Sequence, residues 1–337
     1  MIPAPRIYRL TVLLLLGATF AAHGQQLGQF SQYMQNMYVL NPAAAGVNHQ
    51  TDINLSYRRQ WTGIENAPTV YYVTASTPLG KEYKKPNYRA SSTRISRPQN
   101  FKDIVTRRKA YHGVGGMVAM HEVGAFKKTF GNLSYAVHVP FSKTFTMGFG
   151  ASAGLSNHSF DQSKFDVNEP LDLTYVNFIS GGTSTTVLDI NFGMIGYTES
   201  FYFGYSAAQL LQNDLSFGEN PDDLETAIDL HHYIITGYRK PLNANYTITP
   251  SILFKYASPS PASFDLNVKV DYQDRIWGAF SYRHNAALVL LVGASFNNKL
   301  RFGYSYDYSI SSLRDFNSGS HEIFLGLMLN KRRKIAF

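Results

Sequence analysis

The sequence predicts an all-β protein: a single transmembrane antiparallel β-barrel of about fourteen strands. Three observations predict it. Apolar and polar residues alternate with a period of two over many segments. No segment after residue 24 has the ~18 consecutive apolar residues expected of a membrane helix. Aromatic residues make up 14% of the chain and charged residues only 16%, against roughly 25% charged residues in soluble domains.

Residues 1–24 are predicted to be a secretory signal peptide. Arg6 and Arg9 precede a short apolar run that begins at Leu10, and Ala22 and Gly24 fit the small-residue positions before a cleavage site. The alternative is a membrane anchor, but the apolar run is shorter than the ~20 residues of a spanning helix. The chain has no cysteine, which excludes a lipid-anchored start, disulfides and thiol chemistry.

Residues 25–50 form an amphiphilic N-terminal segment ahead of the first strand. Its apolar side chains include Phe30, Tyr33 and Met34. Asn41 and Pro42 together are a turn signal, and Gly46 can adopt a positive φ before the strand begins. We expect this segment either to enter the barrel as a plug or to lie beneath it as a periplasmic cap.

Residues 51–337 are predicted to form the barrel. Alternation is clearest over 298–310, where Phe302 and Tyr304 oppose Arg301 and Gly303. Pro250 lacks the N–H of a ladder residue and predicts a bulge. The predicted strands cover residues 51–60, 68–77, 111–121, 128–139, 142–157, 185–196, 200–211, 229–239, 244–256, 262–271, 274–284, 286–296, 299–310 and 320–330.

The connections between these strands alternate in length. An even number of strands places both chain ends on the same side, which in such barrels is the periplasm. The predicted periplasmic turns are short, at 139–142, 197–199, 240–243, 272–273 and 297–298, whereas most external loops are long, as at 158–184, 212–228 and 311–319. A soluble β-sandwich has no reason to show this asymmetry, so the connections independently favour a membrane barrel.

The connection over residues 78–110 is an exception, because it is long and lies on the predicted periplasmic side. It has ten basic residues against Glu82 and Asp103, so it carries 10 − 2 = +8, which equals the formal net charge of the whole chain. A solvated basic loop would explain this charge. The sharper hypothesis is an arm that docks an acidic periplasmic partner. The candidate partner-binding residues are Lys81, Lys84, Lys85, Arg89, Arg94, Arg97, Lys102, Arg107, Arg108 and Lys109.

A nucleic acid is not expected as the partner of this basic segment. The chain is predicted to be exported, and the basic residues lack interleaved stacking aromatics. Outer-membrane lipid is the other partner that a membrane barrel implies.

Catalytic and cofactor motifs are absent from the sequence: it has no HExxH, P-loop or zinc spacing. We therefore expect no enzyme, no cofactor and no metal. Asp222, Asp223 and Glu225 could hold calcium, but their spacing is not that of an EF-hand. The inward-facing pairs Arg301 with Asp307, or Asp265 with Lys269, are interpreted as paired polar filling of the lumen.

Three blocks of the sequence resemble a known family. Residues 29–48 read QFSQYMQNMYVLNPAAAGVN, residues 57–63 read YRRQWTG, and residues 67–69 read APT. These blocks, in this order after a signal peptide, resemble the PorP/SprF family of type IX secretion outer-membrane proteins. The matching motif positions are Phe30, Tyr33, Met34, Asn41, Pro42, Gly46, Tyr57, Arg58, Gln60, Trp61, Gly63 and Pro68.

The resemblance implies a non-enzymatic protein, integral to the bacterial outer membrane, that works with the secretion and gliding-motility machinery. The implied partners are a secreted surface protein with a C-terminal sorting domain and periplasmic ring subunits of the PorK/GldK and PorN/GldN type. Trp61, at a predicted strand end, suits the aromatic girdle of a membrane barrel. The alternative function is a passive outer-membrane channel for small solutes, which an open lumen would favour.

Overall fold

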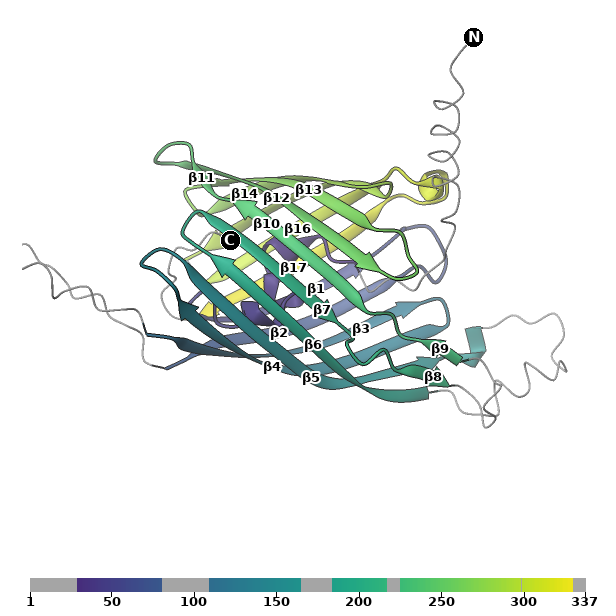
Figure 1. The fold of residues 1–337 in the computed structure, drawn as a ribbon. Helices are drawn as coiled ribbons and strands as arrows, with labels where there is room; N and C mark the ends of the chain where they lie inside the picture. The colour runs from purple at the N-terminus through teal and green to yellow at the C-terminus, as the bar shows by residue number, and fades with distance from the viewer. Residues whose placement is uncertain (1–28, 81–108, 165–183, 217–224, 298, 330–337) are drawn as a thin grey trace, which may run out of the picture.

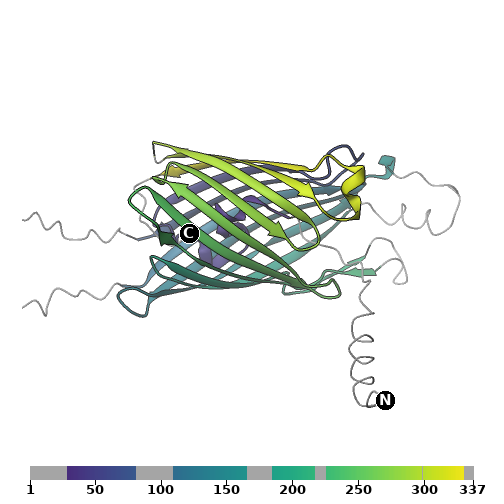
Figure 2. The same ribbon diagram turned by 90° about the horizontal axis from the view of Figure 1, so that it is seen from above.

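A computed structural model describes residues 29–80, 109–164, 184–216, 225–297 and 299–329. Within these residues, fourteen long antiparallel strands close into one barrel (Figures 1 and 2). The strands are β1 (Thr51–Arg59), β2 (Thr69–Leu79), β3 (Tyr111–Val123), β4 (Phe126–Pro140), β5 (Thr146–Phe160), β6 (Ser184–Tyr197), β7 (Phe201–Ala208), β10 (His231–Tyr238), β12 (Tyr246–Ala257), β13 (Ser263–Tyr272), β14 (Ile276–Arg283), β15 (Ala287–Phe296), β16 (Leu300–Ser309) and β17 (Ser320–Leu329).

The pairing of the first strand with the last closes the barrel. β1 pairs with β17 from Thr51↔Leu329 to Arg59↔His321, and β10 joins β7 to β12. The predicted fourteen-strand barrel is therefore confirmed. The remaining short strands are accessory: β8 (Asp214–Ser216) pairs with β9 (Glu225–Ala227) outside the barrel, and β11 (Lys240–Pro241) extends the ladder of β12.

The two faces of each strand differ in polarity. In β16, Leu300 and Phe302 are 54% and 44% exposed, whereas the alternate residues Ser305 and Asp307 are almost fully buried. The same alternation in the other strands gives an apolar outer surface and a polar lining, because successive side chains in a strand point to opposite faces. A continuous apolar outer surface is unfavourable in water and is typical of a barrel in a bilayer, so this outer belt is the surface that a bilayer would cover.

The barrel has two unlike ends. We call the end with Thr51 and Leu329 the terminal end and the other the loop end. The terminal end has the short turns 141–145, 198–200 and 273–275, and also the connection between β2 and β3. The loop end has the longer connections 60–68, 161–183, 209–230 and 310–319, interrupted by tight hairpins at 124–125 and 284–286.

Pro250 does not produce the predicted bulge. The register of β12 with β13 runs without a break from Tyr246↔Tyr272 to Lys255↔Ser263, with Pro250 opposite Val268. On its other side, pairing with β10 stops at Ser251 and resumes with β11 at Ile248. The missing N–H thus falls in a gap of the ladder, where no hydrogen bond is lost and no extra residue is needed.

The N-terminal segment, residues 29–50, lies against the inner wall of the barrel, and we call it the lumenal segment. Both ribbon views place its purple turns among the strands (Figures 1 and 2). It contains three short 3₁₀ turns, η1 (Gln32–Met34), η2 (Met37–Val39) and η3 (Pro42–Ala44). No helix among the described residues is long and apolar enough to cross a bilayer.

Candidate functional site

The lumenal segment crosses the barrel from its loop-end half to its terminal end. Ser31 contacts Glu322, which is paired near the loop end with Arg58 of β1, and Gln50 contacts Asp52 at the terminal end. Between these points, side chains or carbonyl groups of the segment bond the inner wall at almost every turn. The wall residues in these contacts are Thr74, Ser134, His138, Ser206, Asn267 and Arg301.

Asn41 anchors the middle of the segment. Its Oδ1 accepts from the N–H of Ala43 at 2.9 Å, which caps η3. Its Nδ2 donates to the backbone oxygens of Met194 and Tyr205, at 3.0 and 3.1 Å. A buried amide donor or acceptor without a hydrogen-bond partner lowers the stability of the fold. The turn is therefore held at the place on the wall where Asn41 finds these partners.

Two wall glycines allow this close approach. A Cβ on Gly150 would lie 2.6 Å from the Cα of Ala43, and a Cβ on Gly193 would collide with Oδ1 of Asn41. Both glycines point into the lumen, from β5 and β6. Any larger residue at either position would push the segment away from the wall.

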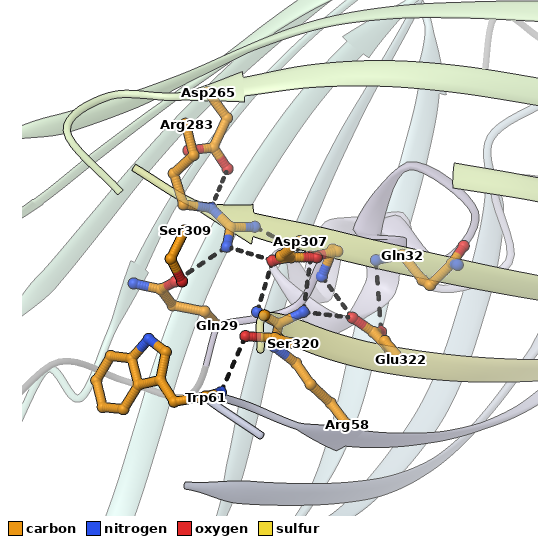
Figure 3. A network of polar contacts seen from close by, with 12 residues as sticks. Gln29, Gln32, Arg58, Trp61, Asp265, Arg283, Asp307, Ser309, Ser320 and Glu322 are labelled. Atoms are coloured by element: carbon orange, nitrogen blue, oxygen red, sulfur yellow. Dashed lines mark hydrogen bonds and ion pairs between the residues drawn. The ribbon is translucent and has the colours of Figure 1, made fainter. Parts of the chain in front are cut away.

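A buried cluster of charges holds the start of the segment, as Figure 3 shows. Arg58 of β1 pairs with Asp307 at 2.8 Å and with Glu322 at 3.4 Å. Arg283 of β14 pairs with Asp307 from the other side, at 3.0 Å. All four side chains are at most 4% exposed. Buried charges are stable only when paired and hydrogen-bonded, and this cluster satisfies that condition across four strands.

Ser31 lies at the centre of this cluster. Its hydroxyl accepts from Arg58 at 2.8 Å and from Arg283 at 3.2 Å, and it lies 3.1 Å from both carboxylate oxygens of Asp307. Its backbone N–H donates to Glu322 at 2.7 Å. One small residue of the lumenal segment therefore completes the coordination of two arginines and two carboxylates.

The cluster extends to a third carboxylate, Asp265 of β13. Arg283 lies 3.5 Å from it, and the ammonium of Lys255 lies 2.8 Å away. Three cations, Arg58, Lys255 and Arg283, thus face three anions, Asp265, Asp307 and Glu322. The cluster is formally neutral, which suits a structural network better than a site that attracts a charged ligand.

The predicted lumenal pairs are wrong in their partners. Arg301 bonds Asn54 and the carbonyl of Gln35, and Lys269 pairs with Asp271 rather than Asp265. The physical reason is distance: residues six apart in one strand are ~20 Å apart. Each side chain reaches a nearer group instead: Arg301 meets β1 and the lumenal segment, and Lys269 meets Asp271, two residues further along its own strand. The inward orientation predicted for these residues is confirmed by their burial.

The family-motif residues fall into four places. Phe30, Tyr33, Met34, Asn41, Pro42 and Gly46 belong to the lumenal segment, and Arg58 belongs to the charged cluster. Tyr57 faces outward and packs on Tyr71, with ring centroids 4.9 Å apart. The rest occupy the loop at 60–68, where Gln60 donates to the carbonyl of Pro68 at 2.8 Å and both Trp61 and Gly63 have positive φ angles, 45° and 103°.

Sequence reasoning missed four members of the cluster: Ser31, Lys255, Arg283 and Glu322. The signal that could have found the three charged members is a charged residue at an inward position of an alternating strand, since an unpaired charge there would be costly. Of the predicted basic arm, residues 81–108 lie outside the described residues, and Lys109 is exposed. The calcium candidates Asp222 and Asp223 also lie outside them. Among the residues that are described, no group of three or more His, Asp or Glu could hold a metal.

A cavity of about 90 Å³ lies beside the lumenal segment, on the side of the lumen away from the charged cluster. Tyr38, Val39, Leu40, Asn41 and Pro42 of the segment line it. Its other walls come from β2 to β7 and β10, and include Lys128 and Asp189.

Comparison with known families identifies one match. A family described as type IX secretion system membrane protein PorP/SprF matches residues 22–327. No curated protein matches the sequence.

Solved structures with a similar outline include three bacterial barrels. They are the translocator domain of autotransporter NalP from Neisseria meningitidis (9% identity, TM-score 0.41, 97% of this chain and 96% of that chain covered), the Pseudomonas putida toluene transporter TodX (8%, 0.46, 90% and 93%) and a Pseudomonas aeruginosa FadL homologue (10%, 0.44, 86% and 91%). Likeness at this level does not bear on function.

Proposed function

Because the chain belongs to the PorP/SprF family of type IX secretion system membrane proteins, we propose that it is a non-enzymatic outer-membrane component of that system. In this proposal it binds a secreted protein with a C-terminal sorting domain at the loop end and links it to the periplasmic ring of PorK/GldK- and PorN/GldN-type subunits. The family match over residues 22–327 carries the proposal.

Placement in the outer membrane is supported by the closed barrel and its apolar belt. Exposed apolar residues such as Val118, Leu133 and Leu290, between 60% and 76% exposed, lie on strands around the circumference. A closed barrel leaves no unpaired strand edge in lipid. The terminal end, with its short turns, is assigned to the periplasm, because barrels of this kind have short turns there and longer loops outside.

Contact with the periplasmic ring is assigned to the basic segment 78–110. Its ends, Leu79 in β2 and Tyr111 in β3, are both at the terminal end, so the segment leaves and re-enters the barrel on the periplasmic side. Its ten basic and two acidic residues favour an acidic protein surface through long-range attraction, which salt weakens.

The test of this contact replaces the basic residues of the segment by Gln and measures which periplasmic proteins co-purify in mild detergent. A matched control neutralises four exposed basic residues in short turns at the same end: Lys143, Lys240, Arg275 and Lys299. We expect the ring subunits to be lost only from the segment variant, and more readily as salt rises. Retention of every partner at low salt would refute the docking role.

The function itself is tested by deleting the gene. We expect loss of one large secreted protein from the cell surface, with nutrient uptake unchanged, and recovery of that protein with the barrel on affinity purification from native outer membrane. A deletion strain that displays all its surface proteins normally would overturn the proposal.

A passive solute channel is the second candidate, and the contents of the lumen speak against it. The lumenal segment is bonded to the wall from Ser31 to Gln50, and the neutral cluster around Arg58 fills the lumen beside its first residues. We expect no steady open-pore conductance from the purified protein in planar bilayers. A stable, high-conductance pore would favour the channel instead.

A further inference from the structure

The cavity beside the lumenal segment lies between the segment and the loop-end half of the barrel wall. Tyr38 to Pro42 of the segment line it, together with Phe30. Its walls come from the middle and loop-end parts of the strands, with Val70 near the start of β2, Lys128 near the start of β4 and Ala208 at the end of β7. A chain that enters from the loop end would therefore meet Tyr38 to Pro42 of the lumenal segment.

The size of the cavity suits a single residue. At roughly 10–15 Å³ for each water-sized site, about 90 Å³ corresponds to about six to nine water positions. That is enough for one large amino acid and too little for a folded domain or a passing hairpin. The apolar part of the lining, which includes Phe30, Met117 and Phe130, would remove the side chain of such a residue from water.

Two charged groups of opposite sign face this space. With its amide oriented to satisfy both ends, Gln209 accepts from Nζ of Lys128 at 2.5 Å and donates to the carbonyl of Asp229 at 3.1 Å. An ammonium has three N–H donors, so Lys128 keeps donors for a ligand. No carboxylate among the described residues lies within 4.0 Å of it.

Asp189 supplies the complementary acceptor. Its side chain is only 9% exposed, and its Oδ1 has no hydrogen-bond partner in the described part of the chain. A buried carboxylate oxygen without a donor is costly, and this one lines the cavity. The neighbouring Asn191, in contrast, is satisfied by Ser152 at 3.0 Å and by the N–H of Gln209 at 2.9 Å.

We infer that this cavity binds the C-terminal residue of a polypeptide. The terminal carboxylate would accept from Lys128, the backbone N–H of the last residue would donate to Asp189, and an apolar side chain would pack on Phe30, Met117 and Phe130. A chain terminus is the one part of a polypeptide that presents these three groups together and needs only one opening. This inference rests on the proposed function, since it specifies how a secreted protein is held.

The experiment measures binding of a fluorescein-labelled peptide, Gly-Ser-Gly-Ser-Leu-Phe, by anisotropy to the purified full-length barrel in detergent. The same peptide with a C-terminal amide is the matched ligand. We expect the free acid to bind at least tenfold more tightly than the amide. Equal binding of the two, or binding of neither, would overturn the inference, and this comparison needs no variant protein.

Variants locate the interaction. Lys128→Gln is expected to reduce the affinity for the acid to that for the amide, and Lys128→Arg to keep the preference. Lys127→Gln is the matched control, because the side chain of Lys127 is 46% exposed and pairs with Glu122 outside the cavity. If Lys128→Gln still prefers the free acid, the terminal carboxylate binds at another site. If decanoate displaces the peptide, the cavity is a site for a small amphiphile. Either result would overturn the inference.

An experiment in cells, which compares the deletion strain with a Lys128→Gln strain, distinguishes this inference from the proposed function. If gene deletion removes the surface protein while Lys128→Gln retains it in full, the secretion role stands and the cavity assignment fails. If the deletion strain keeps its surface proteins, the proposed function itself fails.

Discussion

At the scale of single residues, the lumen is held by charges that are buried but paired. Arg58 and Arg283 share Asp307, and the hydroxyl of Ser31 is bonded to all three. A lone buried ion would be strongly unfavourable, whereas a neutral group of paired charges costs far less and tolerates only one geometry. The cluster therefore specifies where the lumenal segment begins rather than adding much stability of its own.

Asp307→Asn is expected to destabilise the protein by about 3 kcal/mol or more, because two buried guanidinium groups lose their shared anion. The measurement is urea unfolding in lipid vesicles, followed through the fluorescence of the two tryptophans of the chain. Asp315→Asn is the control, since Asp315 is 85% exposed, and should change the unfolding free energy little. Equal effects of the two substitutions would contradict the role of the cluster.

The second prediction at this scale concerns pH. Burial, reinforced by the charge of Asp265, raises the pKa of Tyr33 well above its ordinary value of 10.0. The neutral phenol is therefore favoured in the folded state, and its contribution is complete below about pH 10 and declines as pH rises toward the folded pKa. The loss amounts to about 1.4 kcal/mol at pH 11.

Tyr33→Phe should remove that part of the alkaline sensitivity, because phenylalanine has no proton to lose. The check compares the unfolding free energies of the native and Tyr33→Phe proteins at pH 8 and pH 11. An identical decrease of the unfolding free energy in both proteins would show that ionisation of Tyr33 does not affect stability.

At the scale of elements, the lumenal segment is unusual because it is ordered without regular secondary structure. Its three 3₁₀ turns are each three residues long, and backbone hydrogen bonds within the segment, such as that from Leu40 to the carbonyl of Met37, satisfy part of its polar groups. The wall provides further partners, through groups such as Ser134, Ser206 and His138. Backbone polar groups inside a protein must be satisfied, and here the partners come from strands that are distant in sequence.

Gly193→Val is expected to displace Asn41 and loosen the segment, because the new Cβ would occupy the position of the Asn41 side-chain oxygen. Loosening should appear as new, fluctuating conductance in planar bilayers and as faster proteolysis within residues 29–50. Gly278→Val is the control: a Cβ there would meet only the carbonyl oxygen of Leu291, at 3.8 Å. Conductance as low as that of the native protein would mean that the segment does not close the lumen.

At the scale of the whole molecule, the barrel is a sheet closed on itself with two environments. The pairing of β1 with β17 satisfies the edge strands, and the period of two sorts apolar residues to the outside and polar residues to the inside. Lipid and water can then lie on opposite sides of one layer of backbone. Closure also brings residues from the two ends of the chain together, as Ser31 and Glu322 show.

Leu290→Arg should impair insertion by about 2–4 kcal/mol, the cost of a cation near the bilayer midplane on the lipid face. Leu290 is 60% exposed and lies within β15 between the outward-facing Phe280 and Tyr306. The free energy of folding into vesicles, from urea titration, is the measurement. Leu242→Arg, in the turn between β10 and β12 and 55% exposed, should cost about 0–1 kcal/mol. Equal costs at the two positions would contradict the proposed belt.

The sequence by itself determined the strands and their faces. Strand bounds such as β13 (Ser263–Tyr272) lie within a residue or two of the predicted 262–271, and Arg301 and Asp307 point inward as predicted. Alternation is a local property, set by neighbouring residues and readable from the sequence. The even strand count, and with it the shared side of the start of β1 and the end of β17, follows from the same pattern.

Only the tertiary structure decided what fills the lumen. Ser31 meets Glu322 across 291 residues of sequence, and Asn41 meets Tyr205 across 164. The partners of Arg301, the position of residues 29–50 and the cavity between Lys128 and Asp189 all depend on which strands face each other once the sheet has closed. Such contacts are set by the geometry of closure, and a pattern with a period of two residues holds no information about what lies across the barrel.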